Sequence, residues 1–171
     1  MKTSYSTGSL GAKEITVNHR KVALEWSNRV AAVAHGHYLA ASRYSRLHFW
    51  LGLPTVLLAT IVGTTVFATL QQKPEIWLQI TVGLMSITAA VLSALQSFLN
   101  YSDKTEKHRT AGARYNAIGR ELEQLLAQED NWALLDTIRE KIDQLSQESP
   151  HIPNTVRSSI ADISEGALWT E

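Results

Sequence analysis

Two uncharged stretches decide the fold of this chain: FWLGLPTVLLATIVGTTVFATL at residues 49–70 and IWLQITVGLMSITAAVLSALQSFLNY at residues 76–101. Each exceeds the roughly 20 helical residues that cross a hydrocarbon core about 30 Å thick. The eleven Leu, Ile, Val and Phe residues of the first stretch contribute roughly −3 to −6 kcal/mol to membrane insertion. Only residues 71–75 separate the two stretches. The pattern predicts a membrane hairpin of two transmembrane helices joined by a tight turn.

A large soluble core is the alternative environment for two such helices. A helix that is apolar on all sides needs neighbours on all sides, and the other residues of the chain are polar and helical in pattern. The first 48 residues contain no apolar signal-peptide segment, so we expect the first stretch to be an uncleaved signal anchor. We therefore expect an all-α integral membrane protein.

The distribution of charge predicts the orientation of the hairpin. Net charge is zero, which argues against a nucleic-acid partner, and the chain has no cysteine for disulfides or thiolate metal sites. Basic residues flank both stretches, whereas residues 71–75 contain one lysine beside one glutamate. Cytoplasmic flanks collect Lys and Arg, so we expect a multi-pass inner (plasma) membrane protein with both termini in the cytoplasm. The same basic residues are expected to contact anionic lipid headgroups, or to favour anions at the mouth of an oligomeric pore: Arg43, Arg46, Lys104, Lys107 and Arg109.

The remaining sequence divides into three regions. Residues 1–17 are rich in Ser, Thr and Gly and are expected to be disordered. Residues 18–128 form the two-helix membrane domain, with cytosolic stalk helices at 19–48 and 102–128. Because residues 75–149 contain no proline, the second transmembrane helix is expected to continue unbroken to about residue 128. Residues 129–171 form a cytosolic helical segment and tail, with a helix at about 130–147 capped by Asp130 or Asn131, and a weak final helix around Val156, Ile160 and Ile163.

Apolar and aromatic residues form a stripe along each stalk helix. On the first helix the stripe follows steps of three and four, and on the second it recurs every seven residues. This spacing predicts a coiled-coil-like seam that pairs the two helices into a cytosolic stalk. The residues taken to mark the seam are Trp26, Val33, Tyr44, His108, Tyr115 and Leu122.

A line of polar residues runs along the second transmembrane helix. Gln79, Ser86, Ser93 and Asn100 are seven apart, and Gln96 lies beside them. A bilayer cannot satisfy such a line, so it faces protein or water. Two interpretations stay open: a helix-packing seam, or the uncharged wall of a pore in an oligomer. Thr60 and Thr64 of the first helix are the second choice for a pore face.

Small residues in both transmembrane helices are typical of close helix packing, either within the hairpin or between protomers. They are Thr55, Ala59, Gly63, Gly83 and Ala90. No nucleophile elbow, phosphate-binding glycine loop or paired carboxylate site is found in the sequence. His35 and His37 fall on nearly opposite helix faces, which does not suit a metal site. We therefore predict no enzyme activity, catalytic residue, metal or cofactor.

Several segments resemble the membrane domain of the SLATT family. They are Trp50–Pro54, Ala59–Phe67, Ala89–Phe98, Glu106–Arg109, Ala111–Gly112 and Tyr115, and the resemblance spans about residues 20–128. It implies a prokaryotic two-helix effector that forms pores in nucleotide-second-messenger and ligand-sensing defence systems. No sensing domain is fused to this sequence, so a separate cytosolic sensor or nucleotide-signalling protein is the expected trigger. The resulting prediction is a regulated homo-oligomeric pore; a non-conducting membrane scaffold and a constitutive small-ion channel are the alternatives.

Overall fold

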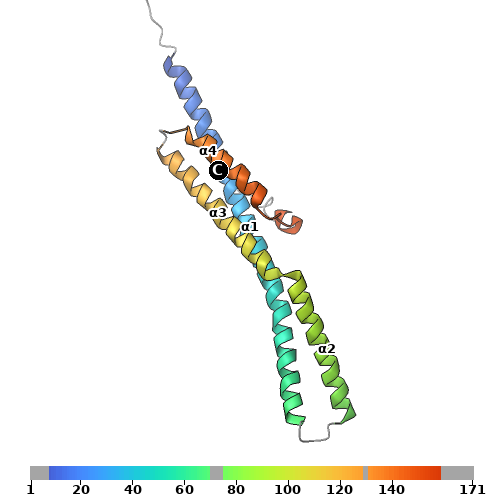
Figure 1. Cartoon of the computed structure of the whole chain (residues 1–171). Helices are drawn as coiled ribbons and strands as arrows, with labels where there is room; N and C mark the ends of the chain where they lie inside the picture. Colours follow the sequence, from blue (N-terminus) through green and yellow to red (C-terminus); the bar gives the residue numbers. More distant parts are fainter. Residues whose placement is uncertain (1–7, 70–74, 129–130, 159–171) are drawn as a thin grey trace, which may run out of the picture. The chain divides into compact units, whose positions relative to one another are not determined.

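The fold is entirely helical. The computed structural model describes residues 8–69, 75–128 and 131–158, and these contain helices but no strand. The helices are α1 (Gly8–Thr69), α2 (Ile76–Leu99), α3 (Tyr101–Gln128) and α4 (Leu134–Glu148) (Figure 1). The predicted all-α class is thereby confirmed. The chain forms two compact units, and α1 contributes residues to both. We call Met1–Ala40 with Lys107–Glu171 the three-helix unit and Ala41–Glu106 the hairpin unit.

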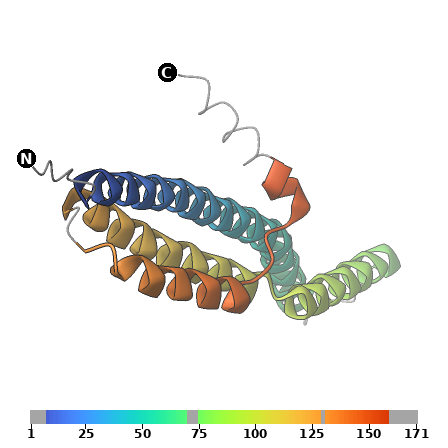
Figure 2. The same ribbon diagram turned by 90° about the horizontal axis from the view of Figure 1, so that it is seen from above.

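The three-helix unit packs the first part of α1, most of α3 and all of α4 side by side (Figure 2). Its core is built from positions three and four apart on each helix, the spacing that places side chains on one helical face. Leu122 of α3 is fully buried, and α4 contributes Leu135, Ile138 and Leu145. The other core members are Ala23, Val30, Ala34, Tyr115, Ile118 and Leu125.

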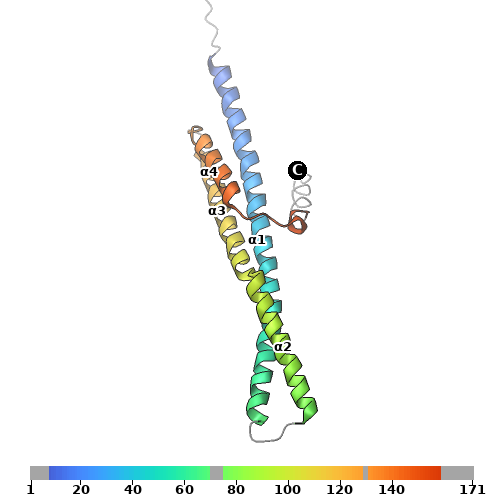
Figure 3. The same ribbon diagram turned by 45° about the vertical axis from the view of Figure 1, so that its right-hand side comes forward.

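The hairpin unit pairs the later part of α1 with α2, and Figure 3 shows the two helices as neighbours. The less exposed positions of both helices alternate in steps of three and four, as expected for two helices packed along their length. On α1 this series is Ala41, Tyr44, His48, Leu51, Thr55, Leu58, Val62, Thr65 and Thr69, and Gly52, Pro54 and Gly63 are half-buried as well. On α2 they are Val82, Met85, Ala89, Leu92, Gln96 and Leu99.

Asn100 interrupts the helix that the sequence predicted to run unbroken to about residue 128, so that prediction is wrong. Asn100 has φ 43° and ψ 49°, the left-handed conformation, and it separates α2 from α3. Its N–H still donates to the carbonyl of Gln96 at 3.2 Å, and the Lys104 N–H donates to the carbonyl of Asn100 at 3.3 Å. Asparagine tolerates this conformation better than most side chains, and it ends a helix without proline or glycine.

Two helix starts also differ from the predictions. The expected disordered segment is wrong for residues 8–17, which belong to α1, while residues 1–7 lie outside the described residues. α4 begins at Leu134 and not at about residue 130, because the chain first makes a turn in which the Leu134 N–H donates to the carbonyl of Asn131 at 3.1 Å. The predicted asparagine cap is therefore wrong, since Ala133 occupies the cap position without a side-chain bond.

Some predictions fall partly or wholly on residues that are not described. Asp130, the other predicted cap, and Ile160 and Ile163 of the final segment lie outside the described residues, as do residues 70–74 of the predicted turn. The described part of the final segment is a short helical turn at residues 154–158, and its Val156 is buried.

Candidate functional site

The hairpin unit exposes large apolar side chains along both helices. Phe98 is 86% exposed, Phe67 78% and Trp77 77%. α1 and the run from Ile76 to Gln128 each contain an apolar window long enough to cross a membrane, and neither window lies inside a core of the structure. Apolar area left in water costs about 25 cal/mol per Å², so a continuous apolar surface of this kind is typical of a helix that contacts lipid.

The polar line of α2 lies beside the surface that α2 packs against α1, and not within it. Ala89 is buried at the centre of that contact surface. At about 100° per residue, Ser93, Ser86 and Gln79 lie roughly 40–80° around the helix from Ala89. All three are exposed, as are Gly83 and Ala90, which lie roughly 100–120° from Ala89. We call Gln79, Gly83, Ser86, Ala90 and Ser93 the α2 flank.

Two residues of the predicted polar line are placed differently from the others. Gln96 is half-buried against α1: a Cβ on Gly52 would stand 3.3 Å from its amide nitrogen. Asn100 ends α2 as described above. Gln96 therefore belongs to the contact between the two helices, whereas the α2 flank is left uncovered by α1.

The hydroxyl groups of both helices bond to their own backbone. Ser86 Oγ donates to the carbonyl of Val82 at 2.9 Å. Thr60 and Thr64 are exposed on α1, and their hydroxyls donate to the carbonyls of Val56 at 2.8 Å and Thr60 at 3.0 Å. A hydroxyl satisfied in this way is tolerated in a bilayer without a partner. The polar residues alone therefore do not require a water-filled pore.

Only some of the small residues of α1 and α2 contribute to the packing between these two helices. Thr55 lies on the side that faces α2, and its hydroxyl donates to the carbonyl of Leu51 at 2.8 Å. Ala59 is exposed. A Cβ added to Gly63 or to Gly83 would meet no atom within 4 Å. The structure thus brings Thr55 into the hairpin contact and leaves Ala59, Gly63, Gly83 and Ala90 free to approach another molecule.

Basic side chains are exposed near the ends of the apolar stretches. The five predicted residues, Arg43, Arg46, Lys104, Lys107 and Arg109, all lie on the surface of their own unit. Lys104 Nζ is 5.9 Å from the ring centroid of Tyr44 and 5.4 Å from that of Tyr101. These two rings stack with centroids 5.8 Å apart. Lysine and tyrosine together are typical of the membrane–water interface.

The predicted seam residues contribute to packing in both units. Trp26 and Val33 are partly buried against the core of the three-helix unit, while His108, Tyr115 and Leu122 are buried in it. Tyr44 belongs to the hairpin unit, where it stacks on Tyr101.

A buried pair of histidines was missed by sequence reasoning. His37 of α1 is 2% exposed and His108 of α3 is 3% exposed, and their Nδ1 atoms are 3.0 Å apart. His37 also stacks on Tyr115, with ring centroids 5.5 Å apart. Each histidine occupies a stripe position on its own helix, so the available signal was the presence of one histidine in each stripe.

Burial determines the protonation of this pair. Burial, and secondarily the charge of His108, lowers the pKa of His37 from 6.5 to about 4. Burial also lowers the pKa of His108. At neutral pH both rings are therefore uncharged, and one ring donates its Nδ1 hydrogen to the Nδ1 atom of the other. The pair joins α1 to α3 through a polar contact inside an otherwise apolar core.

Comparison with protein-family models returns the SMODS and SLOG-associating 2TM effector domain family 4, matched over residues 15–161. The chain belongs to the SLATT family. The resemblance found in the sequence is thereby confirmed, and the match also includes α4, which the resemblance did not reach. No curated protein and no solved structure matches the chain.

Membership of the SLATT family supports a membrane-spanning role for the hairpin unit. The family is a two-transmembrane effector domain, and this SLATT chain has two helices long and apolar enough to cross a membrane. SLATT domains are associated with SMODS and SLOG defence systems. In the described part of this SLATT chain, no group of three or more His, Cys, Asp or Glu residues is arranged to hold a metal ion.

Proposed function

We propose that this SLATT chain is an oligomeric, pore-forming membrane effector in a prokaryotic anti-phage (abortive infection) system. A separate cytosolic sensor or nucleotide-signalling protein opens the pore, and both termini of the chain lie in the cytoplasm. The observation that carries the proposal is the α2 flank, a polar and small-residue surface that the hairpin's own packing leaves uncovered.

The packing of α2 against α1 leaves two other surfaces of α2 exposed. One suits contact with lipid, and the other suits contact with another helix or with water. Ile80, Leu84, Ile87, Val91 and Phe98 lie roughly 140–180° around the helix from Ala89, and all are large, apolar and exposed. This outer surface suits lipid. The α2 flank has no large apolar side chain, so it suits the close approach of another helix or contact with water.

A ring of protomers satisfies both surfaces. A single two-helix hairpin encloses no channel, whereas a repeated contact between different surfaces forms a ring when its rotation closes. In such a ring Gly83 and Ala90, with Ala59 and Gly63 of α1, allow helices of neighbouring protomers to approach closely. Gln79, Ser86 and Ser93 then line an uncharged pore, and Gln96 lies at the side where α2 meets α1. Thr60 and Thr64 remain the second choice for the pore face.

A non-conducting scaffold is the competing function, and one observation favours it. The hydroxyls of Ser86, Thr60 and Thr64 are already bonded within their own helices, so they do not need water. In that case the membrane hairpin would only anchor the three-helix unit, which would bind its partner at the membrane.

Leakage from dye-loaded liposomes separates the two functions. The full-length chain, reconstituted with and without the protein encoded beside it, is expected to release the dye once protein density allows oligomers to form. The double variant Ser86→Leu/Ser93→Leu is expected to insert normally and to abolish release. The control variant Ile87→Leu/Val91→Leu changes the outer surface and is expected to leak like the parent chain. Absence of leakage at every protein density, with and without the partner, would refute the pore.

A further inference from the structure

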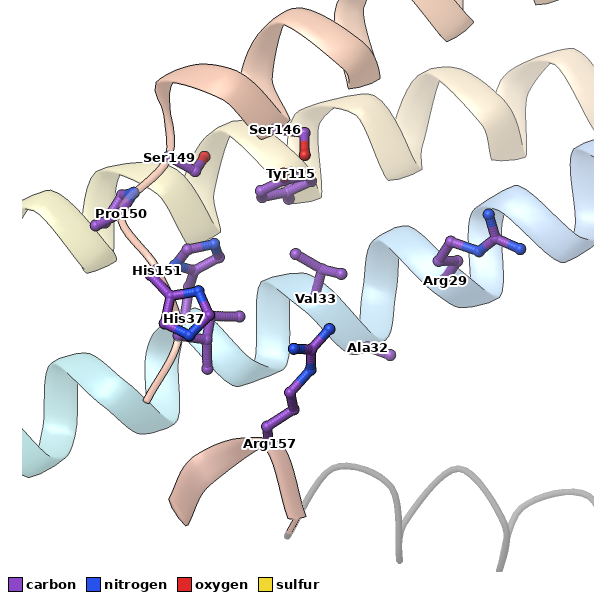
Figure 4. A pocket seen from close by; sticks show the side chains of 11 residues that line it. Arg29, Ala32, Val33, His37, Tyr115, Ser146, Ser149, Pro150, His151 and Arg157 are labelled. Atoms are coloured by element: carbon purple, nitrogen blue, oxygen red, sulfur yellow. The ribbon is translucent and has the colours of Figure 1, made fainter. Parts of the chain in front are cut away.

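A groove in the three-helix unit carries an excess of positive charge. It has a volume of about 520 Å³ and lies where α1, α3 and the end of α4 meet the segment that follows α4. Figure 4 shows Arg29 on α1 and Arg157 reaching toward α1 from the helical turn at residues 154–158. The polar lining also includes His37, Ser146, Ser149 and His151, and no Asp or Glu lines this groove.

The two arginine side chains of the groove have no partner within the described part of the chain. Neither arginine side chain forms a hydrogen bond or ion pair there. Asp143 and Arg29 both line an adjoining hollow, yet no ion pair joins them. The Oγ atom of Ser149 is buried and has no hydrogen-bond partner. Both guanidinium groups are exposed in a groove without a carboxylate, so they are available to bind an anion.

We propose that this groove binds a small soluble molecule that carries a phosphate group. Guanidinium groups bind phosphate oxygens through two parallel N–H donors, and the exposed Ser146 offers a hydroxyl in the same groove. The volume falls within the usual range of small-molecule sites, about 300–1,000 Å³. Val33, Tyr115 and Ile152 give the groove an apolar wall for the organic part of the ligand.

The position of the groove connects the ligand to helix packing. His37 and Tyr115 both line it, and they are the residues that stack where α1 meets α3. A bound molecule therefore bridges α1, α3 and the segment after α4, and it stabilises their association. Ligand binding can be measured without any leakage from liposomes. The test of this site therefore does not depend on whether the chain forms a pore.

The test is a titration of the full-length chain in nanodiscs made only of zwitterionic lipid. Phenyl phosphate is the probe, phenol is the uncharged control, and ionic strength is held constant with NaCl. We expect a saturable rise in melting temperature with phenyl phosphate and none with phenol. Arg29→Gln and Arg157→Gln are each expected to weaken binding about tenfold or more, as for loss of a charged hydrogen bond. Arg157→Lys is expected to bind more weakly than the parent chain but better than Arg157→Gln.

The matched control is Arg120→Gln, which removes an exposed charge from α3 that lines no part of the groove. It is expected to leave the affinity unchanged, and circular dichroism checks that each variant remains helical. Non-saturable stabilisation, or equal weakening by Arg120→Gln, would overturn the site. A second arm uses nanodiscs containing phosphatidate. Stabilisation there without any response to soluble phenyl phosphate would also overturn it, since the recognised group would then be a lipid headgroup.

Discussion

Lowering the pH from 7.5 to 5 is expected to weaken the packing of α3 against α1 in the three-helix unit. The cause is the His37–His108 pair, whose rings are buried and uncharged at neutral pH. Because the folded pKa of His37 is depressed, its neutral form favours folding, and this stability is complete above the unfolded pKa of 6.5. It is lost as the pH falls from 6.5 toward about 4, since the unfolded chain then binds the proton more readily.

The size of the effect follows from the two pKa values. A pKa of about 4 in the folded chain and 6.5 in the unfolded chain correspond to a full loss of roughly 3 kcal/mol below both values. At pH 5 the loss is about 2 kcal/mol from His37 alone. His108 acts in the same direction, because burial lowers its pKa too. Tyr115 on α3 also contacts His37, and the other titratable or charged groups that share the groove with it are Arg29, His151 and Arg157.

Hydrogen exchange of the α3 amides in nanodiscs is the appropriate assay, because it reports local opening of one unit. A loss of about 2 kcal/mol corresponds to a roughly 30-fold lower protection factor at pH 5 than at pH 7.5, after correction for the intrinsic exchange rate. The double variant His37→Phe/His108→Leu replaces both partners with apolar groups and is expected to remove most of this pH dependence. His35→Gln changes an exposed histidine of the same helix and is expected to keep it. A parent chain with constant protection, or a double variant with the same 30-fold loss, would refute the reasoning.

Substitutions at four further positions test the packing and the backbone of the helices. Gly112→Ala is expected to destabilise the three-helix unit, because its Cβ would stand 3.2 Å from a tyrosine ring and 3.3 Å from a backbone carbonyl of α1. Gly119→Ala meets α1 only at 3.8 Å and is expected to stabilise by about 0.5–1 kcal/mol through helix propensity; thermal melts of both variants compare the two. Leu122→Ala, at a fully buried position, is expected to cost about 2–5 kcal/mol in α3 amide protection. Asn100→Ala is expected to cost about 1–2 kcal/mol because of the left-handed backbone, whereas Asn100→Gly is expected to be tolerated in the same melts.

The two long apolar helices and the helix stripes were predictable because each depends on a local pattern. Charge-free length identifies a transmembrane helix, and steps of three, four and seven identify the face that packs. The break at Asn100 was not predictable in this way, since asparagine also occurs inside helices and only the backbone conformation reveals its role.

Contacts between distant segments were also beyond the sequence. The His37–His108 contact depends on how α1 and α3 align across 71 residues of chain. The groove depends on the segment after α4, which brings Arg157 to the same hollow as Arg29. Neither of these contacts produces a periodic pattern in the sequence. The residues themselves could be identified from the sequence, but their proximity in space could not.

The central claim, that the α2 flank lines a pore, is tested most directly by single-cysteine accessibility. The chain contains no cysteine, so Ser86→Cys and Ile87→Cys each introduce the single thiol of the protein. Both variants are reconstituted into leaking liposomes and treated with a membrane-impermeant, positively charged thiol reagent. The proposed pore predicts rapid modification and loss of leakage for Ser86→Cys, with neither change for Ile87→Cys. Modification of Ile87→Cys alone, or leakage that persists after complete modification of Ser86→Cys, would contradict it.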